Sequence, residues 1–323
     1  MKTFEEIFNE LQNNNTSELN ELFINLKEKR KKANKISLFI ISIIDIVLLT
    51  IFLILALNFG KFSIFVFLIP TMIFALITNV LTFVIVSIIL GVNKKQLQFN
   101  NRYKDIVIEK LISNFYNNLE YFPNKEMPRY IYEQPNYEDF NKYYSDDYFE
   151  AQINNKHSIQ MAEVLTQKET TYKDSEGNTH TETVTRFHGL FAKIVIDKSI
   201  NSQLRIMPNG TMLFDKKRLN MDSSEFEKHF DIKASNQIIA MQLLTADIMQ
   251  DLLEFKYKTN MVYDIYINNN ELYLRFHSGK MFEATNIKDY ALDKAIINKY
   301  FYMLNFTYNL SNKLINIINN TQI

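Results

Sequence analysis

The chain has 323 residues, enough for one sizeable domain or two small ones besides any membrane segment. Lysine plus arginine and aspartate plus glutamate number 36 each, so no charge bias points to a nucleic-acid partner. Cysteine is absent, which excludes disulfide scaffolds, thiolate nucleophiles, iron–sulfur clusters and cysteine-based zinc sites.

Residues 1–35 are predicted to form an amphipathic helical N-terminal segment. Apolar residues recur there at helical spacing in two sets: Phe4, Ile7, Phe8 and Leu11, then Leu19, Leu22, Phe23 and Leu26. We expect an asparagine-rich break between the two helices at 13–15, with Thr16 or Ser17 capping the second. Because the polar faces are acidic before Lys27, packing against protein is favoured over binding to anionic lipid.

A transmembrane hairpin is predicted over residues 36–92, with spans at 36–57 and about 66–92. The first run is apolar except for three hydroxyl residues and Asp45, and as a helix it is roughly 33 Å long, close to the thickness of a bilayer core. The second apolar run, 62–92, would cover roughly 46 Å. It can tilt, extend beyond the bilayer or bend at Pro70, and the sequence leaves these alternatives open.

Flanking charge predicts the orientation of this hairpin. Six basic residues precede the first span: Lys27, Lys29, Arg30, Lys31, Lys32 and Lys35. Four follow the second span, namely Lys94, Lys95, Arg102 and Lys104, whereas the connecting turn carries only Lys61. The positive-inside rule therefore predicts a multi-pass protein of the cell membrane with both termini in the cytoplasm. The six residues before the first span are also candidates for contact with anionic lipid.

Asp45 is the one ionisable side chain deep within a predicted span. Folding the hairpin brings it level with Thr71 and Thr78, which belong to a stripe with Ala75 and Thr82. We expect an intramembrane contact between the helices at Asp45, Thr71 and Thr78. The simpler interpretation is a single interhelical hydrogen bond, and the alternative is a proton or ion relay or an oligomer contact.

Residues 93–323 are predicted to form a cytoplasmic α+β domain of antiparallel β-hairpins with flanking helices. A helix is expected over 96–122, followed by extended chain and turns around a surface helix, in which Asp146-Asp147 is expected to lie in a solvated turn. Three hairpins pair 158–172 with 179–196, 204–207 with 211–214, and 261–267 with 271–277. Helices are expected at a short turn capped by Ser223 or Ser224, at 235–255, and at 287–319.

The order of these segments resembles a family of bacterial membrane proteins known only as domain of unknown function 3137. Several segments carry the resemblance: Glu163-Val164, Phe187-His-Gly-Leu-Phe191, Phe226 to Ile232, Leu244 to Met249, Asn269 to Tyr273, and Met281-Phe-Glu283. It covers roughly 146–283 and includes the two spans. The family tends to have an acidic residue where this chain has Asn236. The resemblance implies a membrane-anchored architecture and brings no activity.

The sequence contains no recognised catalytic motif. Gly60-Lys61 and Gly279-Lys280 lack the remainder of a phosphate-binding loop, no His-Glu-x-x-His occurs, and the histidines are scattered. We expect Phe187–Phe191 to be a packed strand in which Gly189 permits close backbone approach or a bulge, and Lys216-Lys217-Arg218 to be a solvated loop. No catalytic or metal-binding residue, cofactor or nucleic-acid partner is predicted.

Three hypotheses for function follow. The first is a membrane-anchored interaction or scaffold module, with the bilayer and a protein partner or second copy of the chain as its partners. The second is an enzyme or transporter accessory subunit whose site assembles only in the tertiary structure. The third is a module that senses anionic lipid. A buried polar pocket uniting Asp146, Asp147, Glu163 or histidines would favour the second, and a groove or open sheet edge without one would favour the first.

Overall fold

The structure is a computed structural model that describes the chain except for residues 60–62, 211–217, 285–290 and 321–323. The chain divides into two compact units. The α+β unit comprises Met1–Glu10, Lys104–Glu283 and Lys294–Ile323. The helical unit comprises Leu11–Tyr103 and Ala284–Asp293.

Three helices make up most of the helical unit: α1 (Phe4–Phe59), whose first residues belong to the α+β unit, α2 (Ser63–Ile89) and α3 (Val92–Tyr103). The predicted break at 13–15 is wrong, because α1 is helical through these asparagines. An asparagine costs a helix less than about 1 kcal/mol relative to alanine. Because the chain is helical on both sides of the asparagines, no new helix has to be nucleated there, and three such residues do not interrupt α1.

The long second apolar run is not one helix. Helix α2 contains Pro70 and ends at Ile89, and its 27 residues give a length of about 40 Å. Leu90 and Gly91 then form a turn, in which Gly91 has φ +64° and its amide donates to the Ile88 carbonyl at 2.9 Å. A left-handed residue at this place is a common helix stop, so α3 starts separately at Val92.

Among the described residues, two helices are long and apolar enough to cross a membrane. The candidate segments are Ser17–Leu55 and Leu68–Ile89. In each, only 6% of the most apolar window is buried by the rest of the protein. The helices therefore differ from the core helices of a soluble protein, whose apolar faces are covered.

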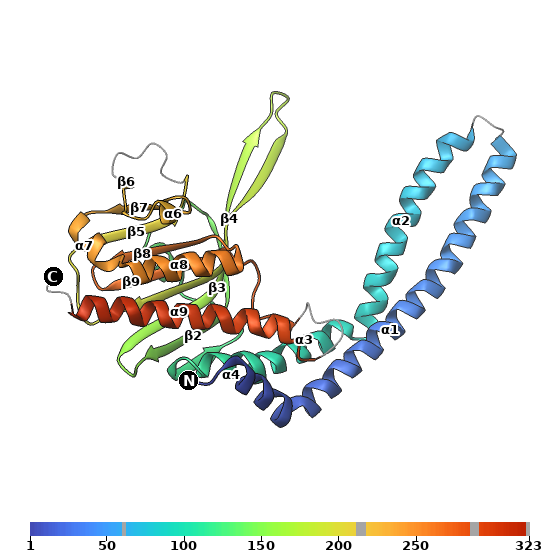
Figure 1. The fold of residues 1–323 in the computed structure, drawn as a ribbon. Helices are drawn as coiled ribbons and strands as arrows, with labels where there is room; N and C mark the ends of the chain where they lie inside the picture. The colour runs from blue at the N-terminus through green and yellow to red at the C-terminus, as the bar shows by residue number, and fades with distance from the viewer. Residues whose placement is uncertain (60–62, 211–217, 285–290, 321–323) are drawn as a thin grey trace. The chain divides into compact units, whose positions relative to one another are not determined.

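Within the described residues, nine strands form one sheet in the order β1-β2-β3-β4-β9-β8-β5-β7-β6 (Figure 1). Neighbouring strands pair antiparallel, which confirms the α+β class. The strands are β1 (Asn117–Phe122), β2 (Lys142–Ile153), β3 (His157–Lys173), β4 (Thr179–Val195), β5 (Gln203–Pro208), β6 (Arg218–Leu219), β7 (Phe230–Ala234), β8 (Tyr263–Asn268) and β9 (Glu271–Phe276).

Helices pack on both faces of this sheet. They are the π-helix η1 (Lys104–Ile108), α4 (Glu109–Ser113), α5 (Arg129–Glu133), α6 (Ser224–Glu227), α7 (Gln237–Leu243), α8 (Ala246–Thr259) and α9 (Lys294–Asn320). Figure 1 shows α8 and α9 lying across one face, where Phe255 stacks on Phe306 with ring centroids 3.8 Å apart. Both rings contact Phe276 of β9. Helix α5 covers the opposite face, where Tyr132 packs on Phe191.

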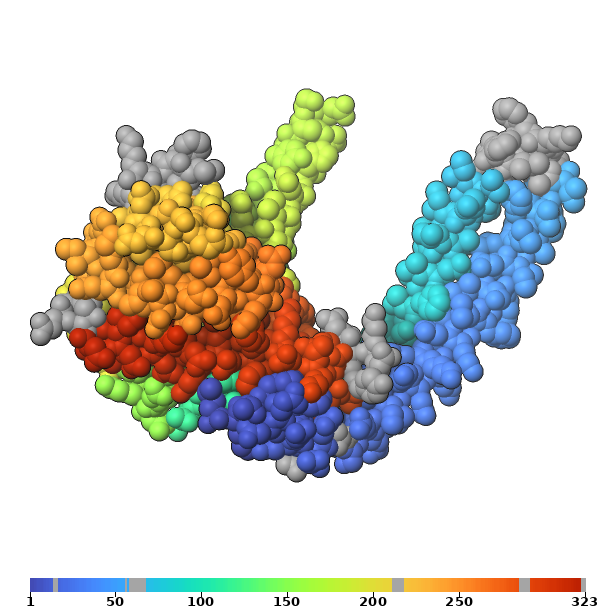
Figure 2. Space-filling view, viewed as in Figure 1, coloured from blue at the N-terminus to red at the C-terminus, as the bar shows by residue number. Residues whose placement is uncertain are grey.

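Two of the three predicted hairpins are confirmed. Strands β3 and β4 pair along their whole length, with Gly177 at φ +86° in the turn, and β8 and β9 turn at Asn269. Beyond Gln167 the β3–β4 hairpin is largely exposed and stands out from the rest of the α+β unit (Figure 2). In the remaining hairpin, 211–214 lies outside the described residues, and β5 pairs instead with β7 and β8.

Several predicted helix boundaries are wrong. The helix expected over 96–122 ends at Ser113, and its last part is strand β1, held by pairing with β2. The helix expected over 235–255 is two helices, because the Thr245 side chain caps α8 by accepting from Ile248 N at 3.4 Å. Helix α9 begins at Lys294, and residues 287–290 lie outside the described residues.

The structure also tests a predicted helix cap and a predicted loop. Ser223, one of the two predicted caps, accepts from Phe226 N and begins α6. Asn236, the residue that departs from the family pattern, caps α7 by accepting from two backbone amides. The solvated loop predicted at 216–218 is wrong for Arg218, which lies in β6 with its Nε 3.0 Å from buried Asp231. Lys216 and Lys217 lie outside the described residues.

Candidate functional site

The pair Asp146-Asp147 lies in strand β2, so its predicted place in a solvated turn is wrong. The β2–β3 register shifts between Asp146 and Phe149, and Asp147 has φ +52°. Such an irregularity is a β-bulge, and it turns the Asp147 side chain into the protein, where its exposure is 0%. Aspartate tolerates the left-handed conformation of bulges as well as that of turns, so the local sequence signal is the same for both.

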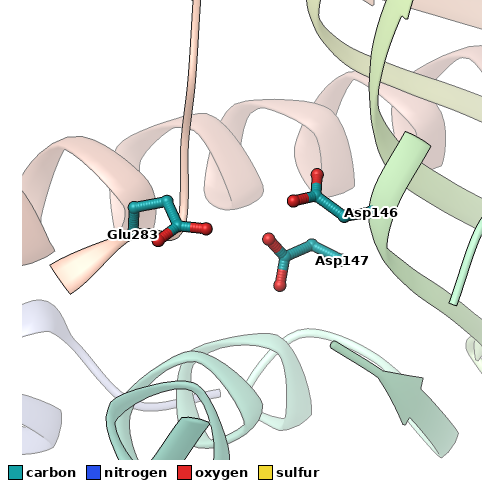
Figure 3. A group of neighbouring side chains, drawn as sticks. All are labelled: Asp146, Asp147 and Glu283. Atoms are coloured by element: carbon teal, nitrogen blue, oxygen red, sulfur yellow. The ribbon is translucent and has the colours of Figure 1, made fainter. Parts of the chain in front are cut away.

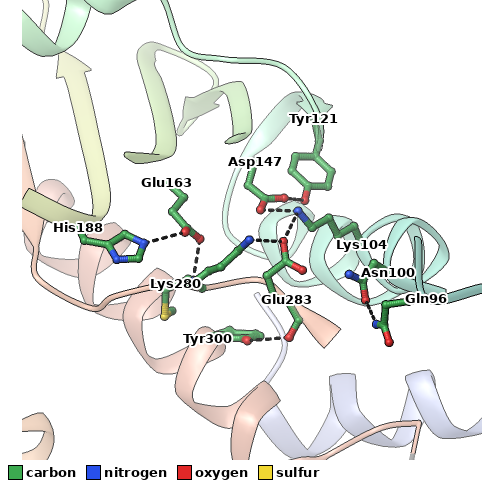
Figure 4. A network of polar contacts seen from close by, with 11 residues as sticks. Gln96, Asn100, Lys104, Tyr121, Asp147, Glu163, His188, Lys280, Glu283 and Tyr300 are labelled. Atoms are coloured by element: carbon green, nitrogen blue, oxygen red, sulfur yellow. Dashed lines mark hydrogen bonds and ion pairs between the residues drawn. The ribbon is translucent and has the colours of Figure 1, made fainter. Parts of the chain in front are cut away.

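Lys104 is the counter-ion of Asp147. It is the first residue of η1, its exposure is 4%, and its Nζ lies 2.7 Å from Asp147 Oδ2 and 3.1 Å from Glu283 Oε1. The Tyr121 hydroxyl donates to the other Asp147 oxygen, and the Tyr300 hydroxyl donates to the Glu283 backbone carbonyl at 3.3 Å (Figure 4). The network therefore joins η1, β1, β2, α9 and the segment after β9.

Burial shifts the titration of these groups. Desolvation raises the pKa of Asp147 to about 7, although Lys104 and the Tyr121 hydroxyl oppose the shift. Burial alone would lower the pKa of Lys104, but Asp147 and Glu283 together raise it above its ordinary value. The lysine is therefore charged at neutral pH, whereas Asp147 titrates within the physiological range.

A pocket of about 350 Å³ lies beside this network. It is lined by Glu126, Tyr144, Ser145, Asp146, Glu163, Leu165, His188 and Lys280. Glu163 pairs with Asp146 on β2 and with Leu190 on β4, so both carboxyl groups lie on the sheet face that α9 covers. His188 comes from β4 and Lys280 from the segment after β9. With Glu126, which lies between β1 and α5, five chain segments thus meet at one pocket.

Glu163 is held in place by two contacts. Its Oε2 accepts from the Met281 amide at 2.7 Å, and its Oε1 lies 3.4 Å from Nε2 of His188 (Figure 4). Burial raises the pKa of Glu163 to about 8 and also raises that of Asp146. Burial and the neighbouring Lys280 lower the pKa of His188. Perturbed titratable groups that converge on a pocket are typical of functional sites.

Gly189 confirms the predicted close backbone approach beside His188. A Cβ built at this position would lie 1.8 Å from the Phe276 carbonyl oxygen. Only a glycine allows β4 to run so close to the end of β9, which is where the pocket segment 277–283 departs.

Asp146, Asp147 and Glu283 each offer a carboxylate oxygen, and these oxygens lie within 4.8 Å of one another (Figure 3). Hard divalent cations prefer such oxygen ligands. However, the Lys104 ammonium already contacts both Asp147 and Glu283. The chain therefore supplies its own cation, and this geometry fits a buried ion-pair network better than a metal site.

Some of the residues singled out from the sequence lie together at this pocket and the adjoining ion-pair network. Asp146, Asp147, Glu163 and one histidine, His188, do converge, as the second functional hypothesis requires. In the sequence, Lys104 stands out only as a flanking charge and Glu283 only as part of the family resemblance. No local pattern could have linked them to Asp147, because the contacts join positions far apart in the chain.

In the helical unit, the partner of Asp45 is a residue that the sequence analysis missed. Asn79 Nδ2 donates to Asp45 Oδ1 at 3.4 Å. The Thr71 and Thr78 hydroxyls donate to carbonyl groups of the preceding turn of α2. A contact of Asp45 with Thr71 or Thr78 stays a prediction. Asn79 was recognisable as a second strongly polar side chain in an apolar helix.

The six basic residues predicted to contact anionic lipid all lie on α1. Two of them donate hydrogen bonds within the helical unit: Lys29 Nζ to the Leu90 carbonyl at 3.0 Å, and Arg30 to the Gln96 side chain. Lys27 Nζ lies over the Phe23 ring, 6.0 Å from its centroid. Contact of this cluster with lipid stays a prediction.

Part of the chain matches a family model. Residues 185–315 match the family model described as "Protein of unknown function (DUF3137)", which confirms for this part of the chain the resemblance predicted from its sequence. The matched range includes His188, Lys280 and Glu283, whereas Lys104, Asp146, Asp147 and Glu163 precede it.

No match was found among the curated proteins. Among solved structures, the chain is similar to the crystal structure of the mycobacterial trehalose monomycolate transport factor A, TtfA, at 7% sequence identity and a TM-score of 0.37. The similarity covers 66% of this chain and 94% of that one. A likeness at this level carries no inference about fold or function.

Proposed function

We propose that this chain is a two-span protein of the cell membrane, with both termini in the cytoplasm, whose α+β unit binds a small ligand carrying a protonated amine. The ligand site is the pocket lined by Asp146, Glu163, His188 and Lys280, called here the Asp146–Glu163 pocket. The observation that carries the ligand proposal is the convergence of these titratable groups, from four segments, on one pocket.

Exposed apolar surface supports membrane insertion. Leu57 on α1 and Ile89 on α2 are 84% and 75% exposed, and the most apolar window of each candidate span is only 6% buried. Each Å² of apolar surface left in water costs about 25 cal/mol, and contiguous patches of this extent are rare on soluble proteins. A bilayer removes that surface from water. The basic residues before α1's apolar run and after α2 then favour cytoplasmic termini.

The charge of the pocket supports an amine ligand. Three carboxyl groups line it, those of Glu126, Asp146 and Glu163, against the single ammonium of Lys280. Burial raises the pKa of Asp146 and Glu163, which means that their charged forms lack sufficient compensation. A bound ammonium would stabilise these charged forms, so binding and ionisation would favour each other.

Native mass spectrometry of the full chain, extracted in mild detergent, tests the ligand proposal. We expect the wild type to retain a small-molecule adduct that the Asp146→Asn, Glu163→Gln double variant loses. The control is Asp222→Asn with Glu182→Gln, which makes the same two kinds of substitution at exposed positions and should keep the adduct. A wild type without an adduct, or an adduct kept by the pocket variant, would contradict the proposal.

A second candidate function is the interaction or scaffold module. It is favoured by the β3–β4 hairpin, whose residues beyond Gln167 and before Phe187 are largely exposed (Figure 2). Such a ribbon leaves strand edges available to a partner. Crosslinking in native membranes should then capture a partner that is lost when 170–182 is replaced by a two-residue Asn-Gly turn between the paired residues Glu169 and Thr183. An unchanged crosslinking pattern would exclude this role for the hairpin.

A further inference from the structure

A second pocket lies in the helical unit. Its volume is about 420 Å³, and it is lined by Asn25, Glu28, Lys29, Lys32, Leu90 and Lys95. The four residues of α1 follow helical spacing and share one face of that helix. Lys95 comes from the first turns of α3, and Leu90 from the turn after α2. Three of the lysines that flank the spans thus converge on one cavity.

Lys29 is oriented by the end of α2. Its Nζ donates to the Leu90 carbonyl at 3.0 Å, and a Cβ built at Gly91 would lie 3.8 Å from the same Nζ. An ammonium group has three donors, so this contact fixes the side chain and leaves further donors for a ligand. At that distance an added methyl group would make only ordinary van der Waals contact with the ammonium, so glycine is favoured here by its φ of +64° and not by the lysine.

The pocket is strongly positive. Three lysines face one acid, Glu28. Helix α3 begins at Val92, has no acidic residue in its first turn, and contributes the partial positive charge of its N-terminus. An anion would offset these like charges, and a phosphate group is the anion that lysines and helix N-termini jointly bind best.

The pocket also lies close to the ends of the apolar runs of α1 and α2. Lys32 and Lys29 precede Ile36, where the apolar run of α1 begins, by about 6 and 10 Å along the helix. Leu90 directly follows the end of α2. Because the headgroup layer of a bilayer is about 5–8 Å thick on each side, Lys32 is level with lipid phosphates when the apolar helices span the core. Lys29 lies just beyond that layer, and its long side chain is able to reach the phosphates.

We propose that the pocket of Lys29, Lys32 and Lys95 binds the phosphate headgroup of an anionic lipid. The lipid part of this inference rests on the proposed membrane insertion of α1 and α2. It sharpens the predicted contact of the basic cluster with lipid. Lys29 and Lys32 form the site together with Lys95, whereas Lys27, Arg30, Lys31 and Lys35 do not line it.

Lipid titration of the full chain in detergent micelles, followed by native mass spectrometry, tests the proposal. The probes are phosphatidylglycerol and phosphatidylcholine. We expect the wild type to bind phosphatidylglycerol more tightly, and Lys29→Gln, Lys32→Gln, Lys95→Gln to weaken that binding about tenfold or more. The matched control, Lys31→Gln, Lys35→Gln, Lys94→Gln, removes the same charge from the same helices without touching the pocket. Equal losses in the two triple variants would overturn the proposal.

A gain-of-binding variant keeps the test decisive if the triple variant misfolds. Glu28→Gln removes the one acidic residue that lines the pocket and should tighten phosphatidylglycerol binding several-fold. Glu21→Gln, which lies nearer the N-terminus of α1 and does not line the pocket, should leave that binding unchanged. Unchanged binding by Glu28→Gln would contradict a phosphate site here.

Two further arms separate the alternatives. Inorganic phosphate, titrated alone at constant ionic strength, should bind weakly. Binding as tight as that of the lipid would overturn the lipid assignment in favour of a soluble phosphate compound. Membrane insertion is read independently by incorporation into lipid nanodiscs. A protein that does not incorporate contradicts the proposed function, whereas one that incorporates but treats both triple variants alike contradicts only the headgroup site.

Discussion

At the scale of single residues, the Lys104–Asp147–Glu283 network joins three charges that are almost fully buried. Burying a charge in protein is tolerated when a counter-ion and hydrogen bonds replace the lost water. Tyr121 and Lys104 together satisfy both oxygens of Asp147. The network is therefore sensitive to the loss of any one member, in contrast to the exposed ion pairs elsewhere on the α+β unit.

Lys104→Met should lower the free energy of unfolding by about 3–5 kcal/mol at pH 8, because it leaves buried carboxylates without their cation. Chemical denaturation in detergent, followed by circular dichroism, measures this loss. The control is Lys110→Met, which removes an ion pair with Glu10 at 3.0 Å between partly exposed side chains and should cost less than about 1 kcal/mol. Comparable losses would show that Lys104 is not the counter-ion argued here.

Stability should also depend on pH through Glu163. Burial raises its pKa from 4.5 to about 8, so between these values the folded state holds a proton that the unfolded state has released. The stabilisation is complete below pH 4.5 and is lost as the pH rises towards 8. Glu163→Gln should make the decline in the free energy of unfolding shallower by about 1.4 kcal/mol per pH unit in this window.

The same denaturation series, repeated across pH, measures this dependence. Exposed Glu182→Gln is the control and should leave the slope of the wild type unchanged. A Glu163→Gln variant whose slope equals that of the wild type would mean that Glu163 is ionised in the folded protein.

The residues of the site were only partly predictable. Asp146, Asp147 and Glu163 could be named from the sequence as groups worth uniting, but Asp147 resembled a solvated turn residue. Its burial depends on a bulge set by pairing with β3, and its charge depends on Lys104, 43 positions earlier. Neither dependence leaves a trace in the residues around Asp147.

At the scale of elements, Gly189 links the pocket to the sheet. Gly189→Ala would place a methyl group against the Phe276 carbonyl and should cost about 1–3 kcal/mol or separate β4 from β9 at this point. Thermal unfolding measures the stability, and hydrogen exchange of the paired β9 amides shows where pairing is lost. Gly177→Asn is the comparison, because nothing lies within 4 Å of a Cβ there and asparagine tolerates its positive φ. If Gly189→Ala and Gly177→Asn lose the same amount of thermal stability, the close backbone approach at Gly189 does not contribute to stability.

Hairpins were the most predictable elements, because their turns carry a local signal. Gly177 and Asn269 occupy left-handed positions, and β-branched or aromatic residues flank both turns. Strand β1 was not predictable, because its pattern also fits the end of a helix and only pairing with β2 decides between them. The α7–α8 break did leave a signal at Thr245, a capping residue that was interpreted as part of one continuous helix.

At the scale of the whole molecule, the two apolar helices were predictable from composition, and their existence as helices is confirmed. The α+β class was predictable from the alternation of hairpins and helices. The order of the nine described strands was not, because β9 and β8 lie between β4 and β5 although they follow both in the chain. Such insertion depends on contacts between distant segments, for which a single sequence carries no direct signal.

The central claim is that the two apolar helices hold the α+β unit, with its pocket, on the cytoplasmic side of the membrane. Since the chain has no cysteine, single cysteines can report its topology without further changes. Lys61→Cys tests the short segment between the spans, and Glu176→Cys tests the exposed end of the β3–β4 hairpin. The measurement is labelling of each variant in intact cells by a membrane-impermeant maleimide. The account predicts that Lys61→Cys reacts at once and that Glu176→Cys reacts only after the membrane is permeabilised. Labelling of Glu176→Cys in intact cells, or protection of Lys61→Cys, would contradict it.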